Sequence, residues 1–285
     1  MKALYFSSKE SSGLTKKFIG FTTETLSKTA PSLFIKISYK VFMNPYSKRE
    51  YDFQNIEPEE FDIKTRQGNI KLHKIVGGEK HILLTHGWGD TSKSFESLVM
   101  HLSNQGYTVW FFDHAGHGKS QTKISNLFAF IDGLESVIAH IEKDNNLYGL
   151  ISHSMGGVAV LNLKEEFLKT KKVILISAPV MFFEEMYNTF DRIGIAPGVL
   201  TQMLEHVSEI YGKSWKTLKP MDQKYKLHEQ ILVIHDKKDK QCKFENMEKL
   251  IENSPVNFKP TEGLGHRRIL KDQDVLNSVA TFLKF

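Results

Sequence analysis

Short apolar segments alternate with helical segments through the middle of the chain, and this alternation limits the fold more than any other feature. The apolar segments are HILLTH (81–86), YTVWFFD (107–113), LYGLISH (147–153), KVILISA (172–178) and QILVIHD (230–236). Their nearly continuous hydrophobicity is typical of parallel strands that are covered on both faces. Since such strands are joined by right-handed crossovers, the sequence predicts a doubly wound, mostly parallel α/β sheet.

The segments around these strands fit the same fold. Residues 125–143 repeat apolar side chains at steps of three and four, as an amphipathic helix does, at Ile131, Leu134, Ile138 and Ile141. Before the first strand, EEFDIKT and NIKLHKIV alternate polar and apolar residues, which predicts an antiparallel pair.

The spacing of the strands predicts the domain organisation. Residues 56–285 form one α/β core, and the longest interval between strands, 181–226, carries Pro197, Pro220 and scattered aromatic residues. We expect this interval to be a small helical cap above the carboxyl ends of the strands, where such sheets bind ligands. Residues 1–55 are predicted to be a basic N-terminal extension that is helical and packs on the core.

The positive charge of the chain is concentrated in its N-terminal segment. Residues 1–50 carry nine Lys and Arg against three Asp and Glu, whereas the remainder carries 29 against 30. A helix with a solvated lysine face explains this balance. The alternative is a weak contact of residues 1–50 with an anionic membrane surface. We expect no nucleic-acid partner.

The remaining composition favours a cytoplasmic protein. The sequence contains no run of 18 apolar residues that would predict a membrane-spanning helix. The N-terminus, MKALYFSSKESSGLTKKFIG, lacks an apolar stretch of signal-peptide length. The single cysteine, Cys242, excludes an internal disulfide and fits a reducing compartment.

Ser154 lies where a predicted strand, LYGLIS, meets a predicted helix, MGGVAVLNLKEEF. A tight turn at this point exposes the serine hydroxyl at the carboxyl edge of the sheet, and it requires small residues two positions before and after. Ser152 and Gly156 supply them, which gives the nucleophile-elbow pattern S-x-S-x-G. The alternative role of Ser154 is a helix N-cap.

A nucleophilic serine needs a base, and the base needs an acid that orients it. The strand ILVIH is followed by DKKD, which offers Asp236 and Asp239, and a later loop, EGLGHRRIL, offers His266. We favour Asp239 because it lies further past the strand, and Asp236 is the fallback, with a turn or cap as its alternative role. The order Ser, Asp, His is that of α/β-fold hydrolases.

An oxyanion that forms at this serine needs N–H donors. Met155 follows the serine at a helix N-terminus, where the dipole favours negative charge. The loop THGWGD (85–90) leaves its backbone open at Gly87 and Gly89, so the N–H of Trp88 is the second candidate.

Five segments together resemble the α/β-hydrolase family, in its serine esterase and lipase-like form. They are HGWGD (86–90), FDHAGHGKS (112–120), SHSMGG (152–157), IHDKKD (234–239) and GLGH (263–266), and they cover roughly residues 57–285. The resemblance implies a triad of Ser154, Asp239 and His266. It also implies that the histidines of HGWGD and FDHAGHGKS are structural. Ser152 and Asp236 stand where the family commonly has glycine.

The sequence thus predicts a serine hydrolase that cleaves carboxylic esters through an acyl-enzyme. Aromatic and apolar residues of the cap favour small to medium acyl or aromatic esters, and the predicted substrate-binding residues are Trp88, Phe182, Phe183, Met186 and Tyr187. No metal or organic cofactor is expected. The alternatives are a thioesterase, lysophospholipase, acyltransferase or peptidase of the same fold, and a non-catalytic protein that binds a small molecule.

Overall fold

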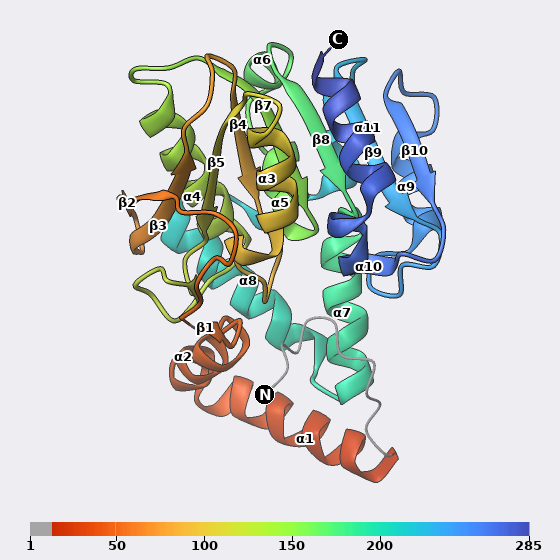
Figure 1. The fold of residues 1–285 in the computed structure, drawn as a ribbon. Coiled ribbons are helices and arrows are strands. Elements are labelled where there is room, and N and C mark those ends of the chain that lie inside the picture. The colour runs from red at the N-terminus through yellow and green to blue at the C-terminus, as the bar shows by residue number, and fades with distance from the viewer. Residues whose placement is uncertain (1–12, 49, 285) are drawn as a thin grey trace.

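A computed structural model describes residues 13–48 and 50–284 (Figure 1). Its centre is an eight-stranded sheet in the order β10-β9-β8-β7-β4-β5-β3-β2. The strands from β5 to β10 in this order pair in parallel, whereas β3 is antiparallel to both β5 and β2. The predicted α/β sheet and its antiparallel first pair are confirmed.

The strands of this sheet have the following bounds: β2 Glu59–Thr65, β3 Gly68–Ile75, β4 His81–Thr85, β5 Thr108–Asp113, β7 Leu147–His153, β8 Lys172–Ile176, β9 Ile231–Asp236 and β10 Asn257–Thr261. Two short strands, β1 (Ser47–Lys48) and β6 (His117–Gly118), form a separate parallel pair.

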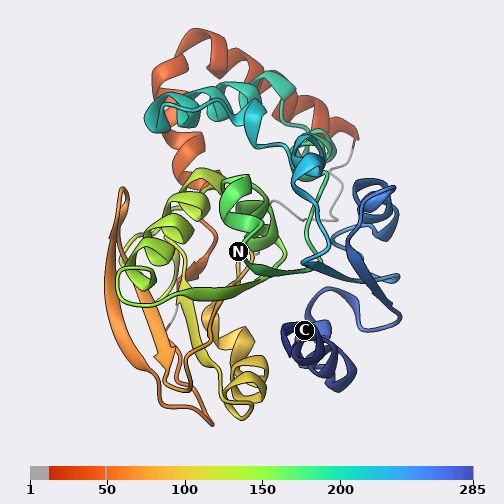
Figure 2. The ribbon, with the colours of Figure 1, turned by 90° about the horizontal axis from the view of Figure 1, so that it is seen from above.

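Helices cover both faces of the sheet (Figure 2). One face packs against η2 (Ser92–Phe95), α3 (Glu96–Ser103), η5 (Ile269–Lys271) and α11 (Gln273–Lys284). The other packs against α4 (Leu127–Ile141), α5 (Met155–Leu161), α6 (Glu165–Leu168) and α9 (Phe244–Ile251). In β4 the side chain of Leu83 joins one core while those of Ile82 and Leu84 join the other, because successive side chains of a strand point to opposite faces. All three are fully buried.

The interval between β8 and β9 is helical, and we refer to this segment as the cap. It contains α7 (Phe182–Ile193), α8 (Pro197–Tyr211), η3 (Trp215–Leu218) and η4 (Pro220–Lys226). The turn from α7 to α8 is made by Gly194, whose φ of 88° lies in the left-handed region. Pro197 occupies the first turn of α8, where its missing N–H is not needed.

The predicted N-terminal extension forms two helices, α1 (Gly13–Thr29) and α2 (Pro31–Phe42). Both contact the cap helices, and the ring of Phe42 lies 4.8 Å from that of Phe190 in α7. The packing of this extension is therefore largely on the cap, above the sheet. Positions 1–12 and 49 of the predicted extension lie outside the described residues. Within the described chain, every helix is too short or too polar to cross a bilayer.

Candidate active site

Ser154 occupies the turn between β7 and α5 with φ 53° and ψ −128°. A residue other than glycine in this region costs about 1–3 kcal/mol and persists only where its surroundings impose it. The N–H of Ser154 donates to the carbonyl oxygen of Ile176 at 2.9 Å, which ties the turn to the neighbouring strand. The serine is 3% exposed. Such a strained turn from strand to helix has the geometry that a nucleophile elbow requires. Although Ser154 stands at the N-cap position of α5, its side chain makes no capping hydrogen bond.

Glycines around this turn allow three segments to approach each other closely. A Cβ on Gly156 would lie 2.5 Å from the carbonyl oxygen of Thr85, and one on Gly157 would lie 2.8 Å from Cβ of Ala178. A Cβ on Gly87 would lie 2.5 Å from Cβ of Ser154. The loop after β4 therefore presses directly on the serine, and a side chain at Gly87 would displace it.

His266 connects the serine to Asp239. Its Nε2 lies 3.0 Å from Oγ of Ser154, and its Nδ1 lies 2.8 Å from Oδ2 of Asp239. The carboxylate accepts only, so Nδ1 carries the proton and Nε2 is left to accept from the serine hydroxyl. His266 is carried by the short helix α10 (Gly265–Arg268). The structure thus brings the three predicted residues into one hydrogen-bonded chain.

Asp239 is held in its ionised form. Its Oδ1 accepts from the backbone N–H groups of Gln241 and Cys242 at 2.8 and 3.0 Å. Burial opposes the charge, but the hydrogen bond and the charge of His266, together with these N–H donors, keep the pKa of Asp239 below its ordinary value.

Asp236, the alternative acid, faces a different part of the structure. As the last residue of β9, it accepts from the N–H groups of Lys238 and Leu264 at 2.9 Å each and from the hydroxyl of Thr261 at 2.9 Å. Burial opposes its charge, but the backbone donors of the loop before His266 lower its pKa. Asp236 therefore holds the loop that carries His266, and it does so through the backbone and Thr261.

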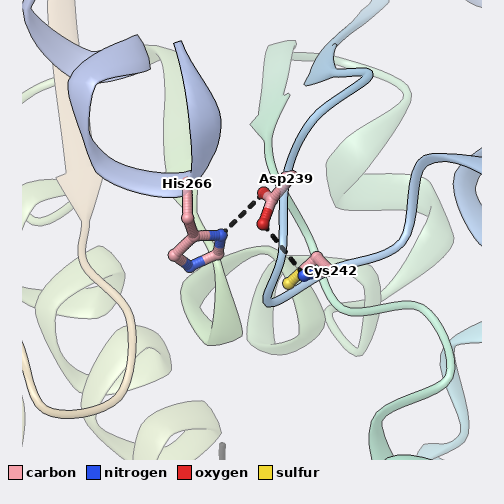
Figure 3. Close-up of side chains that lie close together, drawn as sticks. All are labelled: Asp239, Cys242 and His266. Atoms are coloured by element: carbon pink, nitrogen blue, oxygen red, sulfur yellow. Dashed lines mark hydrogen bonds and ion pairs between the residues drawn. The ribbon is translucent and has the colours of Figure 1, made fainter. Parts of the chain in front are cut away.

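Cys242 lies beside the acid and the base (Figure 3). Ligand atoms of Asp239, Cys242 and His266 lie within 4.8 Å of one another, a spacing that a metal ion would accept. Burial and the nearby charges of Asp239 and Glu185 raise the pKa of the Cys242 thiol well above its ordinary value. The thiol is therefore protonated at neutral pH and would first have to lose its proton to bind a metal.

His153 supports His266 from behind, a contact that sequence reasoning missed. Its Nε2 donates to the carbonyl oxygen of His266 at 2.7 Å. Burial, with a smaller effect from the charge of His266, lowers the pKa of His153 to about 3, so this ring stays neutral. The sequence signal was the position of this histidine directly before the serine, where a side chain of β7 reaches the loops beyond the sheet.

Three buried histidines fix the loop of the predicted oxyanion donors. His86 Nδ1 donates to the carbonyl oxygen of Gly87 at 2.8 Å, while its Nε2 accepts from the N–H of His114 at 3.1 Å. His117 Nε2 accepts from the N–H of Gly89 at 3.1 Å. Burial lowers the pKa of His114 well below its ordinary value and that of His117 to about 3. The rings of His114 and His117 therefore stay neutral, and the hydrogen bonds of His86 and His117 hold the loop in place.

The buried Asp113 belongs to the same framework. Its carboxylate accepts from the hydroxyl of Tyr51 at 2.7 Å and from the N–H groups of Ser92 and Lys119 at 2.8 Å each. Every bond joins a loop or a helix start to the end of β5. We therefore regard Asp113 as a residue that organises loops and not as a second catalytic acid.

The two predicted oxyanion donors belong to the two segments that adjoin the serine. Met155 is the first residue of α5, where a helix leaves its N–H without an intrahelical acceptor. Trp88 belongs to the loop whose glycine presses on Ser154. Both residues are nearly buried and both line the same cavity.

This cavity lies between the cap and the elbow and is almost entirely apolar. The volume of the cavity that the centre of a water-sized sphere can reach is about 20 Å³. The lining residues are Met43, Trp88, Asn126, Leu127, Phe128, Met155, Phe182, Phe183, Met186, Leu204 and Val207. Four of the predicted substrate-binding residues are among them. Met43, which follows α2, was not foreseen, because nothing local in the sequence connects that segment with the serine.

Tyr187 is the predicted substrate-binding residue that lies apart from this cavity. Its hydroxyl is 2.9 Å from the hydroxyl of Thr201 in α8, and its ring lies 6.3 Å from that of Trp215. One helical residue turns the side chain by about 100° from that of Met186, and this rotation takes Tyr187 to the contact between the cap helices.

Comparison with known families agrees with this architecture. Residues 78–258, well over half of the chain, match the family model Hydrolase_4, described as serine aminopeptidase, S33. The chain belongs to this α/β-hydrolase family. The match to the family model begins at residue 78, after α1, α2 and the antiparallel strands β2 and β3. The two N-terminal helices therefore lie outside the matched region.

Individual relatives are more distant. Human monoglyceride lipase is 30% identical over 136 residues, which are 45% of this chain and 43% of the lipase. An uncharacterized protein of Mycobacterium tuberculosis is 26% identical over 128 residues, 44% of this chain and 37% of that protein. These alignments span less than half the length of the curated relatives.

Solved structures share the fold of the hydrolase. An esterase of Pyrococcus furiosus superimposes with a TM-score of 0.63 at 18% identity and covers 83% of this chain and 97% of its own. An esterase of Butyrivibrio proteoclasticus, solved with ferulic acid, superimposes with a TM-score of 0.60 at 15% identity, over 79% and 97% of the two chains.

Proposed function

We propose that this hydrolase cleaves carboxylic esters with an apolar acyl group, through an acyl-enzyme on Ser154. The observation that carries the proposal is the hydrogen-bonded chain from Ser154 through His266 to Asp239, with Nε2 of the histidine 3.0 Å from the serine oxygen. That distance lies within the range for proton transfer to a general base.

In the first half of the reaction, Oγ of Ser154 attacks the ester carbonyl carbon while its proton passes to Nε2 of His266. The N–H groups of Trp88 and Met155 stabilise the oxyanion, and Asp239 stabilises the imidazolium. The bond from carbon to the leaving oxygen then breaks, and the alcohol departs with the proton that His266 returns.

The second half repeats these steps with water as the nucleophile. Water attacks the acyl carbon of the acyl-enzyme and gives its proton to His266. The bond to Oγ breaks, the serine recovers the proton, and the carboxylic acid is released. The ionised Asp239 is required in both halves, and its lowered pKa keeps it charged at neutral pH.

The character of the cavity supports an ester over a peptide with a free amino terminus. A substrate ammonium group needs a carboxylate partner, and none of the described residues that line the cavity is acidic. Two acids of the cap instead face lysines of the chain: Glu185 lies 3.9 Å from Lys243, and Glu205 lies 3.4 Å from Lys216. Monoglyceride lipase and the esterase structures agree with an ester substrate.

The cap must open for such a substrate to bind. The cavity of about 20 Å³ holds little more than a single water, so an acyl chain needs α7 and α8 to move away from Trp88 and Met155. Short acyl groups require a smaller displacement of the cap helices than long ones. We therefore expect turnover to depend on the length of the acyl chain, and a series of esters measures this dependence.

The proposal is tested by labelling with a fluorophosphonate probe and by turnover of a nitrophenyl ester series. We expect labelling of the wild type, none of Ser154→Ala, and turnover of esters. The matched control is Ser152→Ala, which removes a neighbouring buried hydroxyl that bonds the carbonyl oxygen of Ile174 at 3.1 Å.

Two outcomes would contradict the proposal. Well-folded wild type that takes up no probe would favour a protein that binds small molecules without turnover. Labelling of Ser154 with turnover of aminoacyl amides but no esters would favour a peptidase.

A further inference from the structure

Large apolar side chains are exposed mainly on the two N-terminal helices. Eleven such side chains are exposed among the described residues, and eight of them lie between positions 14 and 46: Leu14, Phe18, Phe21, Leu26, Leu33, Ile37, Val41 and Tyr46. A concentration of this kind, unlike single apolar residues scattered over a surface, marks an interaction site.

Helix α1 places most of its large apolar residues away from the protein, whereas Ile19 is partly buried against the core. Phe18 and Phe21 are 69% and 72% exposed, whereas Ser27 is 7% exposed. A Cβ on Gly20 would lie 3.2 Å from the carbonyl oxygen of Gly194, and the hydroxyl of Thr23 accepts from the N–H of Ala196 at 3.3 Å. Small residues therefore face the cap and phenylalanines face outward, the reverse of an ordinary surface helix.

Helix α2 shows the same reversal over part of its surface. Leu33 and Ile37 are 61% and 54% exposed, and Ser38 is 4% exposed. Spacing of four residues puts Leu33, Ile37 and Val41 on one side of the helix. The helix also has a packed side, on which the ring of Phe42 contacts that of Phe190.

Lysines flank these outward faces. Lys17 and Lys28 in α1 and Lys36 and Lys40 in α2 are exposed and lie beside the apolar side chains on the helical surface. Lys28 pairs with Glu24, but Lys17, Lys36 and Lys40 have no acidic partner among the described residues. Long lysine side chains can extend along apolar surface and keep their charge at an aqueous boundary.

We propose that the outward faces of α1 and α2 dock on a lipid surface with anionic headgroups. The N-terminal patch consists of Leu14, Phe18, Phe21, Leu33, Ile37 and Val41 with the four flanking lysines. Apolar side chains bounded by lysines, three of which have no acidic partner among the described residues, suit the boundary between acyl chains and negative headgroups. A second copy of the chain would bring the same positive charges together, so charge favours lipid over self-association.

The patch lies on the layer that covers the cavity. In Figure 1, α1 lies at the edge of the molecule opposite α11, beyond the cap helix α8. The segment after α2 reaches the cavity itself through Met43. Docking would therefore bring the cap against the lipid surface, a role that goes beyond ester cleavage and does not depend on it.

The proposal is tested by flotation of the full chain with vesicles. One set is phosphatidylcholine alone, and the other contains about 30% phosphatidylserine, which supplies the negative surface potential. We expect binding to the anionic vesicles that decreases with salt. Phe18→Ser with Phe21→Ser should reduce the partition coefficient by at least tenfold, since each lost ring removes buried apolar area.

The lysines and a distant apolar residue provide the controls. Lys17→Gln with Lys36→Gln should reduce anionic binding by about tenfold or more, at roughly 1 kcal/mol for each lysine. Tyr225→Ser removes a ring that is 65% exposed outside the patch and should leave binding unchanged. Equal effects of the patch and Tyr225 variants would overturn the proposal.

Other partners give different results. Concentration-dependent dimers that Phe18→Ser with Phe21→Ser dissolves, without vesicle binding, would assign the patch to a second copy. If the protein binds vesicles only after deletion of residues 1–12, the partner of the N-terminal patch is that segment of the chain. If the protein binds DNA in a salt-sensitive way and binds no vesicles, the partner is nucleic acid. Each result overturns the proposal. Ser154→Ala should float as the wild type does, so failure of the lipid proposal is distinguishable from failure of the enzymatic one.

Discussion

The sheet body and the N-terminal helices distribute polar and apolar residues in opposite ways. In the body, β4 is buried along its whole length. Buried polar residues of the body, such as His114 and Asp113, are hydrogen-bonded. In α1 the buried residue is a serine, and the phenylalanines are exposed. The buried, hydrogen-bonded residues of the body have fixed positions. The exposed phenylalanines of α1 would lower the free energy of the system only when a partner covers them.

On the two functions that we propose, this difference separates catalysis from docking within one chain. A reaction geometry at Ser154 needs many polar contacts that support one another, as the strained turn and the buried histidines around it provide. The N-terminal patch needs only exposure, spacing and charge. Changes in the body should therefore alter turnover or stability, and changes in the patch should alter binding to lipid.

The largest expected effect is that of Ser154→Ala. Loss of the nucleophile should reduce kcat by about 10⁴- to 10⁶-fold, since triad members act as a unit. Turnover of a short nitrophenyl ester measures it. Vesicle flotation should stay at the wild-type level, and a parallel loss of flotation would mean that the two regions are not separable.

The two aspartates at the end of β9 should differ in kind. Asp239→Asn should lower kcat by about 10⁴-fold, because an amide can donate to Nδ1 and favour the wrong tautomer of His266. Asp236→Asn should lower the free energy of unfolding by about 1–3 kcal/mol. The N–H and O–H groups that donate to Asp236 would then lose a charged acceptor.

The pair is measured by kcat on a short ester and by urea unfolding. If Asp236→Asn lost more kcat than Asp239→Asn and kept its stability, Asp236 would be the acid that orients His266.

Gly87→Ala should lower kcat by about 10²-fold. The new Cβ would lie 2.5 Å from Cβ of Ser154, and a displacement of about 1 Å at the nucleophile has an effect of this size. Gly198→Ala in α8 is the matched control, since nothing lies within 4 Å of its Cβ position. The control should keep kcat and gain up to about 1 kcal/mol of stability in its helix. Equal activities of the two variants would show that the loop does not press on the serine.

Stability should fall as the pH drops below about 6.5, the ordinary pKa of histidine. The folded-state pKa values of His114, His117 and His153 are lowered mainly by burial, so the unfolded chain binds more protons below that pH. Each ring removes up to about 1.4 kcal/mol of stability per pH unit until its folded pKa is reached. Urea unfolding between about pH 7 and 5 measures the slope.

His117→Gln should flatten this slope, because its amide cannot become protonated in the unfolded chain. A slope that is the same in the wild type and in His117→Gln would remove this buried histidine as its cause.

The smallest effect is expected for Phe21→Ser, which should change the free energy of unfolding by no more than about 0.5 kcal/mol. The matched change in the body, Phe130→Ala, removes a fully buried ring stacked 3.7 Å from His114 and should cost about 3–5 kcal/mol. Thermal or urea unfolding gives both values. Similar losses would mean that the outward ring of α1 already has a partner within the chain.

Much of the body follows from local patterns. The apolar runs predicted the parallel strands, and the S-x-S-x-G turn with the later aspartate and histidine predicted the residues of the hydrogen-bonded chain. The position of Met43 in the cavity could not be predicted, because it depends on how segments distant in sequence pack together. For His153 the sequence offered only its position directly before the serine, and its contact with His266 also depends on such packing.

The sequence by itself determined the order of strands and helices, the small residues that the serine turn requires, and the basic charge of the N-terminal segment. These features depend on neighbouring residues, whose periodicity and size act locally. Tertiary structure decided which aspartate meets His266, because the end of β9 turns one carboxylate toward the loop at 261–264 and the next turn directs the other to the ring. It also decided that α1 buries its serine and exposes its phenylalanines, because the backbone of α1 closely approaches the cap at Gly20.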